Sequence, residues 1–288
     1  MNIEDIKTVG IVGAGSMGAG IAQAAAQSGF QVKVVDVSDA VWARAGKTIA
    51  KSLERLAAKE KITEAQMKDA LGLLSFSTDM GTLAGVPFVF EAVFENIDVK
   101  RELFSKLDAI CGDDVVYASN TSSIAITEMA SLVKRPGRFV GMHFFNPVPM
   151  MRLVEVIPAM QTEKSVTELA MAMAVKLGKT PITCKDTPGF VVNRLLIPYM
   201  LDAVRLLEAG VASAQDIDTA MKLGAGMPMG PFELMDFTGV EISHLVGEIF
   251  YGYTKEARFA SPGLLRNMVS AGYLGRKTGK GFYEYPPK

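Results

Sequence analysis

Cysteine and histidine are scarce in this chain, and long apolar runs are absent. Among 288 residues only Cys111 and Cys184 are cysteines, too few and too far apart for a disulfide framework or a closed zinc site. No apolar run approaches the roughly 18 residues that would span a bilayer. The opening residues, MNIEDIK, lack the basic start and the apolar stretch of a secretory signal. We therefore expect a cytoplasmic protein with reduced cysteines, no metal and no membrane partner.

An excess of one charge is also missing. The 30 lysines and arginines nearly balance the 31 aspartates and glutamates, which leaves a formal net charge of -1. Because nucleic-acid-binding domains normally carry a clear basic excess, no nucleic-acid partner is expected. With 49% hydrophobic and 21% charged residues, the composition argues against disordered, collagen-like and coiled-coil classes. At about 100 to 200 residues per domain, the length allows one large domain or two smaller ones.

The first two thirds of the chain have the pattern of a parallel sheet. Short β-branched apolar runs alternate with longer amphipathic segments, as in successive βαβ units. These runs are apolar nearly throughout, as expected of strands that helices cover on both faces. The clearest strand candidates are Thr8 to Val12, Gln31 to Val35, Val86 to Phe90, Val115 to Ala118, Phe139 to His143 and Leu153 to Ile157.

After residue 186 the strand signals nearly stop. Pro188 and Gly189 supply a local break in the chain. We therefore expect an α/β domain with a mostly parallel sheet over residues 1–186 and a smaller all-α domain over residues 187–288. The apolar spacing in the second part predicts helices over Val191 to Ala209, Ala214 to Leu223, Val240 to Tyr251 and Gly263 to Ser270.

A glycine-rich turn follows the first predicted strand. In this setting the first glycine permits a tight turn, the second lets the backbone approach a pyrophosphate, and the third allows close packing of the next helix. The helix N-terminus then offers free N–H groups to the phosphates. The pattern predicts a dinucleotide site at Gly13, Ala14, Gly15, Ser16, Met17 and Gly18.

Asp36, at the end of the second strand, bears on which dinucleotide binds. A carboxylate here can accept hydrogen bonds from the adenosine ribose, and its charge would repel the 2′-phosphate of NADP. We therefore expect NAD as the cofactor. The alternative is that Asp36 only caps the helix that follows.

A stripe of basic residues marks that following helix. Lys47, Lys51, Arg55 and Lys59 recur every four positions, which places them on roughly one face. Because like charges so placed repel one another, a polyanion such as coenzyme A would relieve the repulsion. An ordinary solvated face explains the spacing equally well.

The residues best suited to proton transfer lie on two later strands. Of the two histidines, His143 ends an apolar strand, where parallel sheets form their ligand crevices, whereas His244 falls in an apolar helical pattern and is expected to be structural. Glu155 lies within the next apolar strand and needs a partner if it is buried. If the two strands are neighbours, Glu155 can pair with His143 and fix its tautomer. The alternatives for Glu155 are a salt bridge to Arg152 and an exposed edge position.

Polar residues also follow the strand that ends at Ala118. Residues 119–123 read Ser-Asn-Thr-Ser-Ser, and their side chains can bind a carbonyl or cap the next helix. Asn193 lies early in the first helix after the predicted boundary. Its amide can project into a cleft between the domains, although position alone distinguishes it from a surface asparagine.

Seven longer motifs can be read in the chain: GIVGAGSMG from Gly10, SNTSSI from Ser119, HFFNPVP from His143, KDTPGFVVNR from Lys185, DTAMK from Asp218, GPFE from Gly230 and GRKTGKGFY from Gly275. With these motifs the chain resembles the L-3-hydroxyacyl-CoA dehydrogenase family, most of all its bacterial short-chain branch, the 3-hydroxybutyryl-CoA type. These motifs run from the first strand to the last tyrosines. The resemblance implies a Rossmann-type domain with a helical-hairpin insertion, and a C-terminal helical domain that forms a homodimer.

The resemblance also implies an activity and a role for each matching residue. Such an enzyme oxidises an (S)-3-hydroxyacyl-CoA, here a short one such as 3-hydroxybutanoyl-CoA, to the 3-ketoacyl-CoA, with NAD as hydride acceptor. His143 matches the catalytic base and Glu155 the carboxylate that orients it. Ser122 and Asn193 match the groups that hold the reacting oxygen and the thioester, and Ser122 also matches a cofactor contact. Further matches are cofactor contacts at Asp36, Glu95, Lys100, Asn146 and Lys277, and coenzyme A contacts at Ser52 and Lys59.

Two other interpretations compete with this one. A β-hydroxyacid dehydrogenase that acts on a free acid has a similar glycine turn but uses a catalytic lysine, where this chain has the motif that begins at His143. A nucleotide-binding structural protein is the second alternative. The presence of all four catalytic residues argues against it, and turnover would decide.

Overall fold

The computed structural model describes residues 1–286 of the chain, which divides into two compact units between Phe190 and Val191. The sequence places the boundary slightly earlier, between residues 186 and 187. That the two units are independent domains stays a prediction. Each unit is described below by itself.

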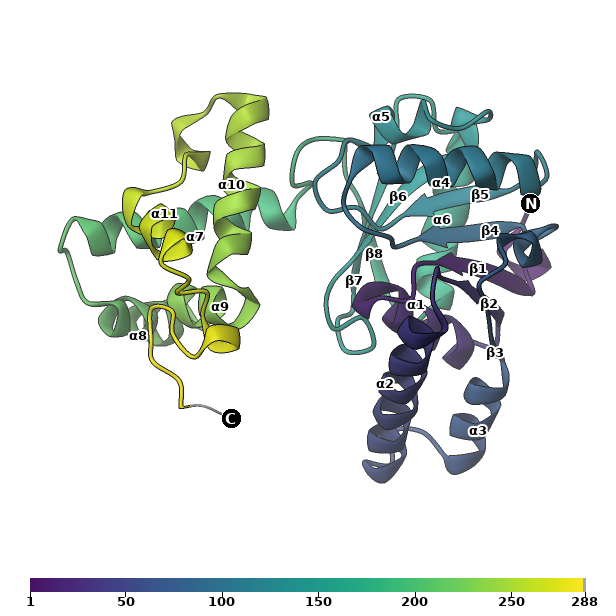
Figure 1. Ribbon diagram of the computed structural model, residues 1–288, viewed down its shortest axis with the longest axis horizontal. Coiled ribbons are helices and arrows are strands. Elements are labelled where there is room, and N and C mark those ends of the chain that lie inside the picture. Colours follow the sequence, from purple (N-terminus) through teal and green to yellow (C-terminus); the bar gives the residue numbers. More distant parts are fainter. Residues whose placement is uncertain (287–288) are drawn as a thin grey trace. The chain divides into compact units, whose positions relative to one another are not determined.

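The first unit is built on one eight-stranded sheet with the order β3-β2-β1-β4-β5-β6-β7-β8 (Figure 1). Neighbouring strands are parallel except β6 and β7, which pair antiparallel. The prediction of a mostly parallel α/β sheet is therefore confirmed. The strands are β1 (Thr8–Val12), β2 (Gln31–Val35), β3 (Leu74–Ser77), β4 (Phe88–Glu91), β5 (Val116–Ser119), β6 (Phe139–Phe144), β7 (Leu153–Pro158) and β8 (Thr180–Thr183).

Helices cover both faces of this sheet, which explains why its central strands are mostly apolar. Successive residues of β1 face opposite sides, so Ile11 joins the core under one helical layer and Val12 joins the core under the other. The first layer contains α1 (Ser16–Gln27) and α6 (Lys164–Lys176). The second contains α4 (Ile97–Ile110) and α5 (Ile126–Ala130).

A pair of helices is inserted between β2 and β3 and projects beyond the sheet (Figure 1). These are α2 (Asp39–Ala58) and α3 (Glu64–Gly72), and they match the expected helical hairpin. On α2 the buried residues Ala45, Ile49 and Leu53 recur every four positions, so one face packs inward. The basic residues of the stripe occupy other positions of the same helix.

The second unit consists of helices, as the sequence predicts. Its core includes Leu201, Phe232, Phe250 and Phe259. Among the described residues, no helix is both long enough and apolar enough to cross a membrane. The helices of this unit are α7 (Val192–Glu208), α8 (Ala214–Gly224), α9 (Pro231–Thr238), α10 (Val240–Thr254) and α11 (Gly263–Ser270), and short 3-10 turns in the chain lie at Ile3–Asp5, Met80–Leu83, Pro136–Arg138, Ala257–Phe259 and Arg276–Thr278.

Candidate active site

Hydrogen bonds connect the residues at the carboxyl ends of the central strands of the first unit. Ala92 N donates to Val12 O at 2.8 Å, and Asn120 N donates to Glu91 O at 2.9 Å. The Asn120 side chain then accepts a hydrogen bond from Phe144 N at 2.9 Å. These contacts connect the glycine-rich turn after β1 with the loops after β4 and β5 and with the end of β6. Parallel sheets bind their ligands at this edge.

His143 and Glu155 form a buried pair across β6 and β7. The two residues lie directly opposite each other in the antiparallel register, and His143 Nδ1 is 2.7 Å from Glu155 Oε2. His143 is 6% exposed and Glu155 is 0% exposed, which excludes the exposed edge position. Because an ionised carboxylate only accepts, Nδ1 is the donor in this contact, and in the neutral imidazole Nε2 then keeps its lone pair. The rings of Phe145 and Phe190 flank the imidazole, with centroids 4.6 and 5.6 Å away.

The glycine-rich turn has room for a pyrophosphate at one glycine only. A Cβ on Gly13, where φ is +98°, would lie 2.5 Å from Ala92 O, and one on Gly18 would lie 1.8 Å from Gly13 O. A Cβ on Gly15 would meet no atom within 4 Å. A cavity of about 290 Å³ opens at this point, lined by Ala14, Gly15, Ser16, Ala19, Val41, Arg44, Ala45 and Thr48. Its position and its backbone N–H groups fit the phosphates of NAD.

Asp36 turns its carboxylate toward the glycine-rich turn. Its Oδ2 accepts from Ala14 N at 2.6 Å and its Oδ1 from Val37 N at 2.7 Å. The cap of α2 is Ser38, whose hydroxyl accepts from Ala40 N. Asp36 is therefore not the helix cap, and its negative charge lies beside the candidate cofactor cavity.

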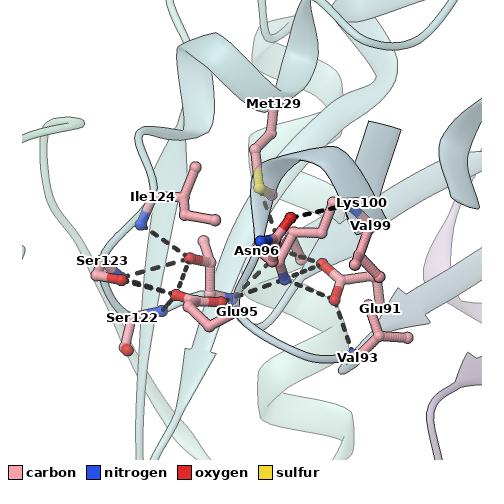
Figure 2. Close-up of polar contacts among 12 residues, drawn as sticks. Glu91, Val93, Glu95, Asn96, Val99, Lys100, Ser122, Ser123, Ile124 and Met129 are labelled. Atoms are coloured by element: carbon pink, nitrogen blue, oxygen red, sulfur yellow. Dashed lines mark hydrogen bonds and ion pairs between the residues drawn. The ribbon is translucent and has the colours of Figure 1, made fainter. Parts of the chain in front are cut away.

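The loop that carries Ser122 is held by Glu95 (Figure 2). Glu95 Oε1 accepts from Ser122 N at 3.0 Å, from Ser123 N at 3.1 Å, and from the hydroxyls of Thr121 and Ser123. Burial raises the pKa of Glu95, but the Lys100 ammonium and these hydrogen bonds lower it more, so the pKa lies below its usual range. Among the described residues, the Ser122 hydroxyl has no hydrogen-bond partner, which leaves it available to a ligand.

The structure places the remaining candidates of the first unit on three elements. Lys100 lies on α4, 1% exposed, with its ammonium bound by carboxylates. Asn146 follows β6, and its Oδ1 accepts from Ser16 Oγ of the glycine-rich turn at 3.4 Å. Ser52 is half-buried on α2, and the exposed Lys59 caps the end of that helix. Among the described residues, no ion pair involves a member of the basic stripe.

Asn193 and Lys277 belong to the second unit. Asn193 lies in the first turn of α7, and Lys277 donates to Glu241 of α10. Their contacts with substrate and cofactor stay predictions. His244 is bonded through Nδ1 to Ser261 Oγ at 2.8 Å, in agreement with a structural role.

Two neighbours of the site escaped the sequence analysis. Glu91 is buried beneath the Ser122 loop and accepts a hydrogen bond from Ser119, and Asp186 caps α5 by accepting from Ile126 N and Thr127 N at 3.0 and 2.7 Å. A signal existed for Glu91, because an acid that ends an apolar strand needs a buried partner. No comparable signal marked Asp186, which is remote in sequence from the helix that it caps.

Comparison with known proteins covers both units. Residues 8–187 match the family model described as "3-hydroxyacyl-CoA dehydrogenase, NAD binding domain", and residues 189–285 match "3-hydroxyacyl-CoA dehydrogenase, C-terminal domain". The chain belongs to the 3-hydroxyacyl-CoA dehydrogenase family. The predicted family is thus confirmed, as are its NAD cofactor and its class, an NAD-dependent oxidoreductase.

Relatives within the 3-hydroxyacyl-CoA dehydrogenase family align over nearly the whole chain. The mitochondrial hydroxyacyl-coenzyme A dehydrogenase of Mus musculus is 46% identical over 97% of this chain and 91% of its own length. The 3-hydroxybutyryl-CoA dehydrogenase of Mycobacterium tuberculosis is 44% identical over 97% and 99%. The crystal structure of (S)-3-hydroxybutyryl-CoA dehydrogenase from Ralstonia eutropha is 48% identical and superposes with a TM-score of 0.95 over 98% of this chain and 100% of that one.

Proposed function

We propose that this chain catalyses the NAD-dependent interconversion of a short (S)-3-hydroxyacyl-CoA, such as 3-hydroxybutanoyl-CoA, and the corresponding 3-ketoacyl-CoA, acetoacetyl-CoA. The observation that carries the proposal is the buried His143–Glu155 pair, 2.7 Å apart, on the sheet edge that also holds the glycine-rich turn. The named relatives that act on 3-hydroxybutyryl-CoA support the substrate class.

In this mechanism His143 moves the proton, and Glu155 orients the imidazole ring of His143. With Nδ1 bonded to the carboxylate, His143 Nε2 takes the proton of the substrate 3-hydroxyl during oxidation and returns it during reduction. Glu155 holds the ring in this tautomer and stabilises the imidazolium as it forms. Bound NAD supplies the acceptor for the hydride from C3.

Polar groups around this pair hold the substrate. The backbone N–H of Ser122 is already bonded to Glu95, and its hydroxyl donates to the reacting oxygen. Asn193 holds the thioester, and Ser52 and Lys59 on α2 bind coenzyme A, whose phosphates offset the basic stripe. Asp36 disfavours a 2′-phosphate and so favours NAD over NADP.

The same proposal covers assembly and location. We expect a homodimer through the second unit, because α10 leaves Ile242, Leu245, Ile249 and Tyr253 exposed at helical spacing. We also expect the protein to be located in the cytoplasm. The relatives include proteins named as mitochondrial as well as bacterial ones.

Turnover of matched substrates tests the proposed function. The purified protein is mixed with acetoacetyl-CoA or free acetoacetate and with NADH or NADPH, and nicotinamide absorbance is followed. We expect NADH oxidation with the thioester alone, and a slower rate with NADPH. Equal rates with free acetoacetate would favour a dehydrogenase of free acids, and binding of NADH without any turnover would favour a structural nucleotide-binding protein.

A further inference from the structure

A buried ion pair lies behind the loop that carries Ser122. Lys100 on α4 and Glu91 at the end of β4 are 1% and 0% exposed, and the Lys100 ammonium is 2.6 and 2.8 Å from the two Glu91 carboxylate oxygens. Ser119 Oγ and Val93 N also donate to this carboxylate, at 2.5 and 2.8 Å. Glu91 therefore satisfies its hydrogen bonds within the protein and has no surface on which a ligand can bind.

The same ammonium reaches a second carboxylate, and this one holds the loop. Lys100 Nζ is 3.3 Å from Glu95 Oε2, while the other oxygen of Glu95 receives the donors from residues 121–123 (Figure 2). Glu95 thus joins a buried cation on one side to the backbone of Ser122 on the other. The Ser122 N–H is used in this contact, and the Ser122 hydroxyl is left free for a substrate.

Charge explains why the cation matters for the loop. Two carboxylates share one ammonium, so without Lys100 the buried Glu91 would lose its counter-ion and the two acids would repel each other. The repulsion would be relieved by protonating one acid or by moving the more exposed one, Glu95, away from the loop. Stability alone does not call for such a group, because buried ion pairs can often be replaced by apolar side chains without loss.

We propose that Glu91 and Lys100 are positioning residues for Ser122: the buried ion pair fixes Glu95, and Glu95 fixes the loop so that the Ser122 hydroxyl points to the substrate. The proposal rests on the function proposed above, in which Ser122 binds the reacting oxygen. It gives Lys100 a role through Glu95 in addition to the cofactor contact that the family resemblance implies.

Four variants test this link. Lys100→Met removes the cation at similar length, and Glu91→Gln/Lys100→Met removes one acid together with it. Lys106→Met and Glu102→Gln are the matched controls, because both change exposed residues of the same helix, α4. For each protein we measure kcat with acetoacetyl-CoA, the NADH dissociation constant, and amide hydrogen exchange of the Ser122 segment without ligand.

We expect Lys100→Met to speed exchange of the residue 122 and 123 amides about tenfold or more. Its kcat falls by about tenfold or more, and its NADH affinity falls in step with the loss of exchange protection, because Glu95 and Ser122 are themselves matched to cofactor contacts. The double variant recovers part of the lost exchange protection and part of the lost kcat, because the second acid beside Glu95 is then neutral while the ammonium that held Glu95 is still missing. If Lys100→Met does not fold, Lys100→Gln takes its place, because its amide can still donate to Glu91. It must then show faster exchange and lower kcat than the wild-type protein.

Two results would overturn the proposal. Unchanged exchange at residues 122 and 123 in folded Lys100→Met would break the link from the ion pair to the loop. A double variant whose exchange protection recovers while its kcat does not would show that turnover depends on Lys100 itself and not on the loop. Failure of the proposed function is distinct from both, because the wild-type protein would then not reduce acetoacetyl-CoA, whereas the exchange experiment needs no substrate.

Discussion

Replacing Glu155 by glutamine removes the charge from the partner of His143 and keeps the shape of the side chain. The wild-type contact is 2.7 Å long and wholly buried, so neither water nor salt can substitute for it. Hydrogen bonds to charged groups contribute about 1.5–3 kcal/mol, against about 0.5–1.5 kcal/mol for neutral ones. The lost difference of about 1–1.5 kcal/mol corresponds to roughly a 5- to 13-fold fall in rate if it is felt in the transition state.

The amide can also do more damage than the loss of charge. If its NH₂ group donates to Nδ1 of His143, the ring proton moves to Nε2 and the base is lost. In a Ser-His-Asp site, the equivalent acid-to-amide change costs about 10⁴-fold through the wrong tautomer. We therefore expect Glu155→Gln to lower kcat by at least about fivefold and by up to about 10⁴-fold.

The assay is NADH oxidation with acetoacetyl-CoA at saturating substrate, with the melting temperature and NADH affinity recorded in parallel. Glu168→Gln on α6 is the control, because Glu168 is exposed and, within residues 1–286, pairs only with the surface residue Lys164. It should leave kcat unchanged. A folded Glu155→Gln protein with kcat within about twofold of wild type would refute the role assigned to Glu155.

Three further predictions concern the cofactor site and its supports. Gly15→Ala should keep the wild-type melting temperature and bind NADH about tenfold or more weakly, because its methyl group fills the open space. Gly18→Ala should lower the melting temperature, because its methyl group clashes with Gly13 O. Equal melting temperatures for the two variants would contradict this assignment. Asp36→Ala should narrow the preference for NADH over NADPH by about tenfold, and an unchanged ratio of kcat/KM values would count against its role. The pKa of Glu95 is lowered in the folded protein, so its contribution to stability is present above its ordinary pKa and disappears as the pH falls through the lowered value. The difference in melting temperature between wild type and Glu95→Gln should therefore shrink on acidification. A difference that widens would contradict the lowered pKa.

The sheet could be predicted because most of its strands are buried on both faces. β1 and β2 begin and end where the apolar runs do. β3 and β8 were not among the clearest candidates, since these four-residue strands are half-buried and their composition is mixed. The antiparallel pairing of β6 with β7 could not be predicted either, because an apolar run carries no sign of its direction.

The site could be predicted only in part for a related reason. Sequence position placed His143 and the glycine-rich turn at the carboxyl edge, where any parallel sheet binds ligands. The contact between His143 and Glu155 depended on whether their strands are neighbours, and the register supplied the answer. The ion pair between Glu91 and Lys100 was not predicted, because the sequence does not show which charged residues become partners in the interior.

Turnover by a His143→Gln protein tests the central claim most directly. General acid–base catalysis by one side chain typically contributes about 100- to 10,000-fold. We predict that kcat for NADH-dependent reduction of acetoacetyl-CoA falls within this range while the NADH dissociation constant stays within about twofold of wild type. A folded His143→Gln protein that keeps more than about a tenth of wild-type kcat would show that another group moves the proton.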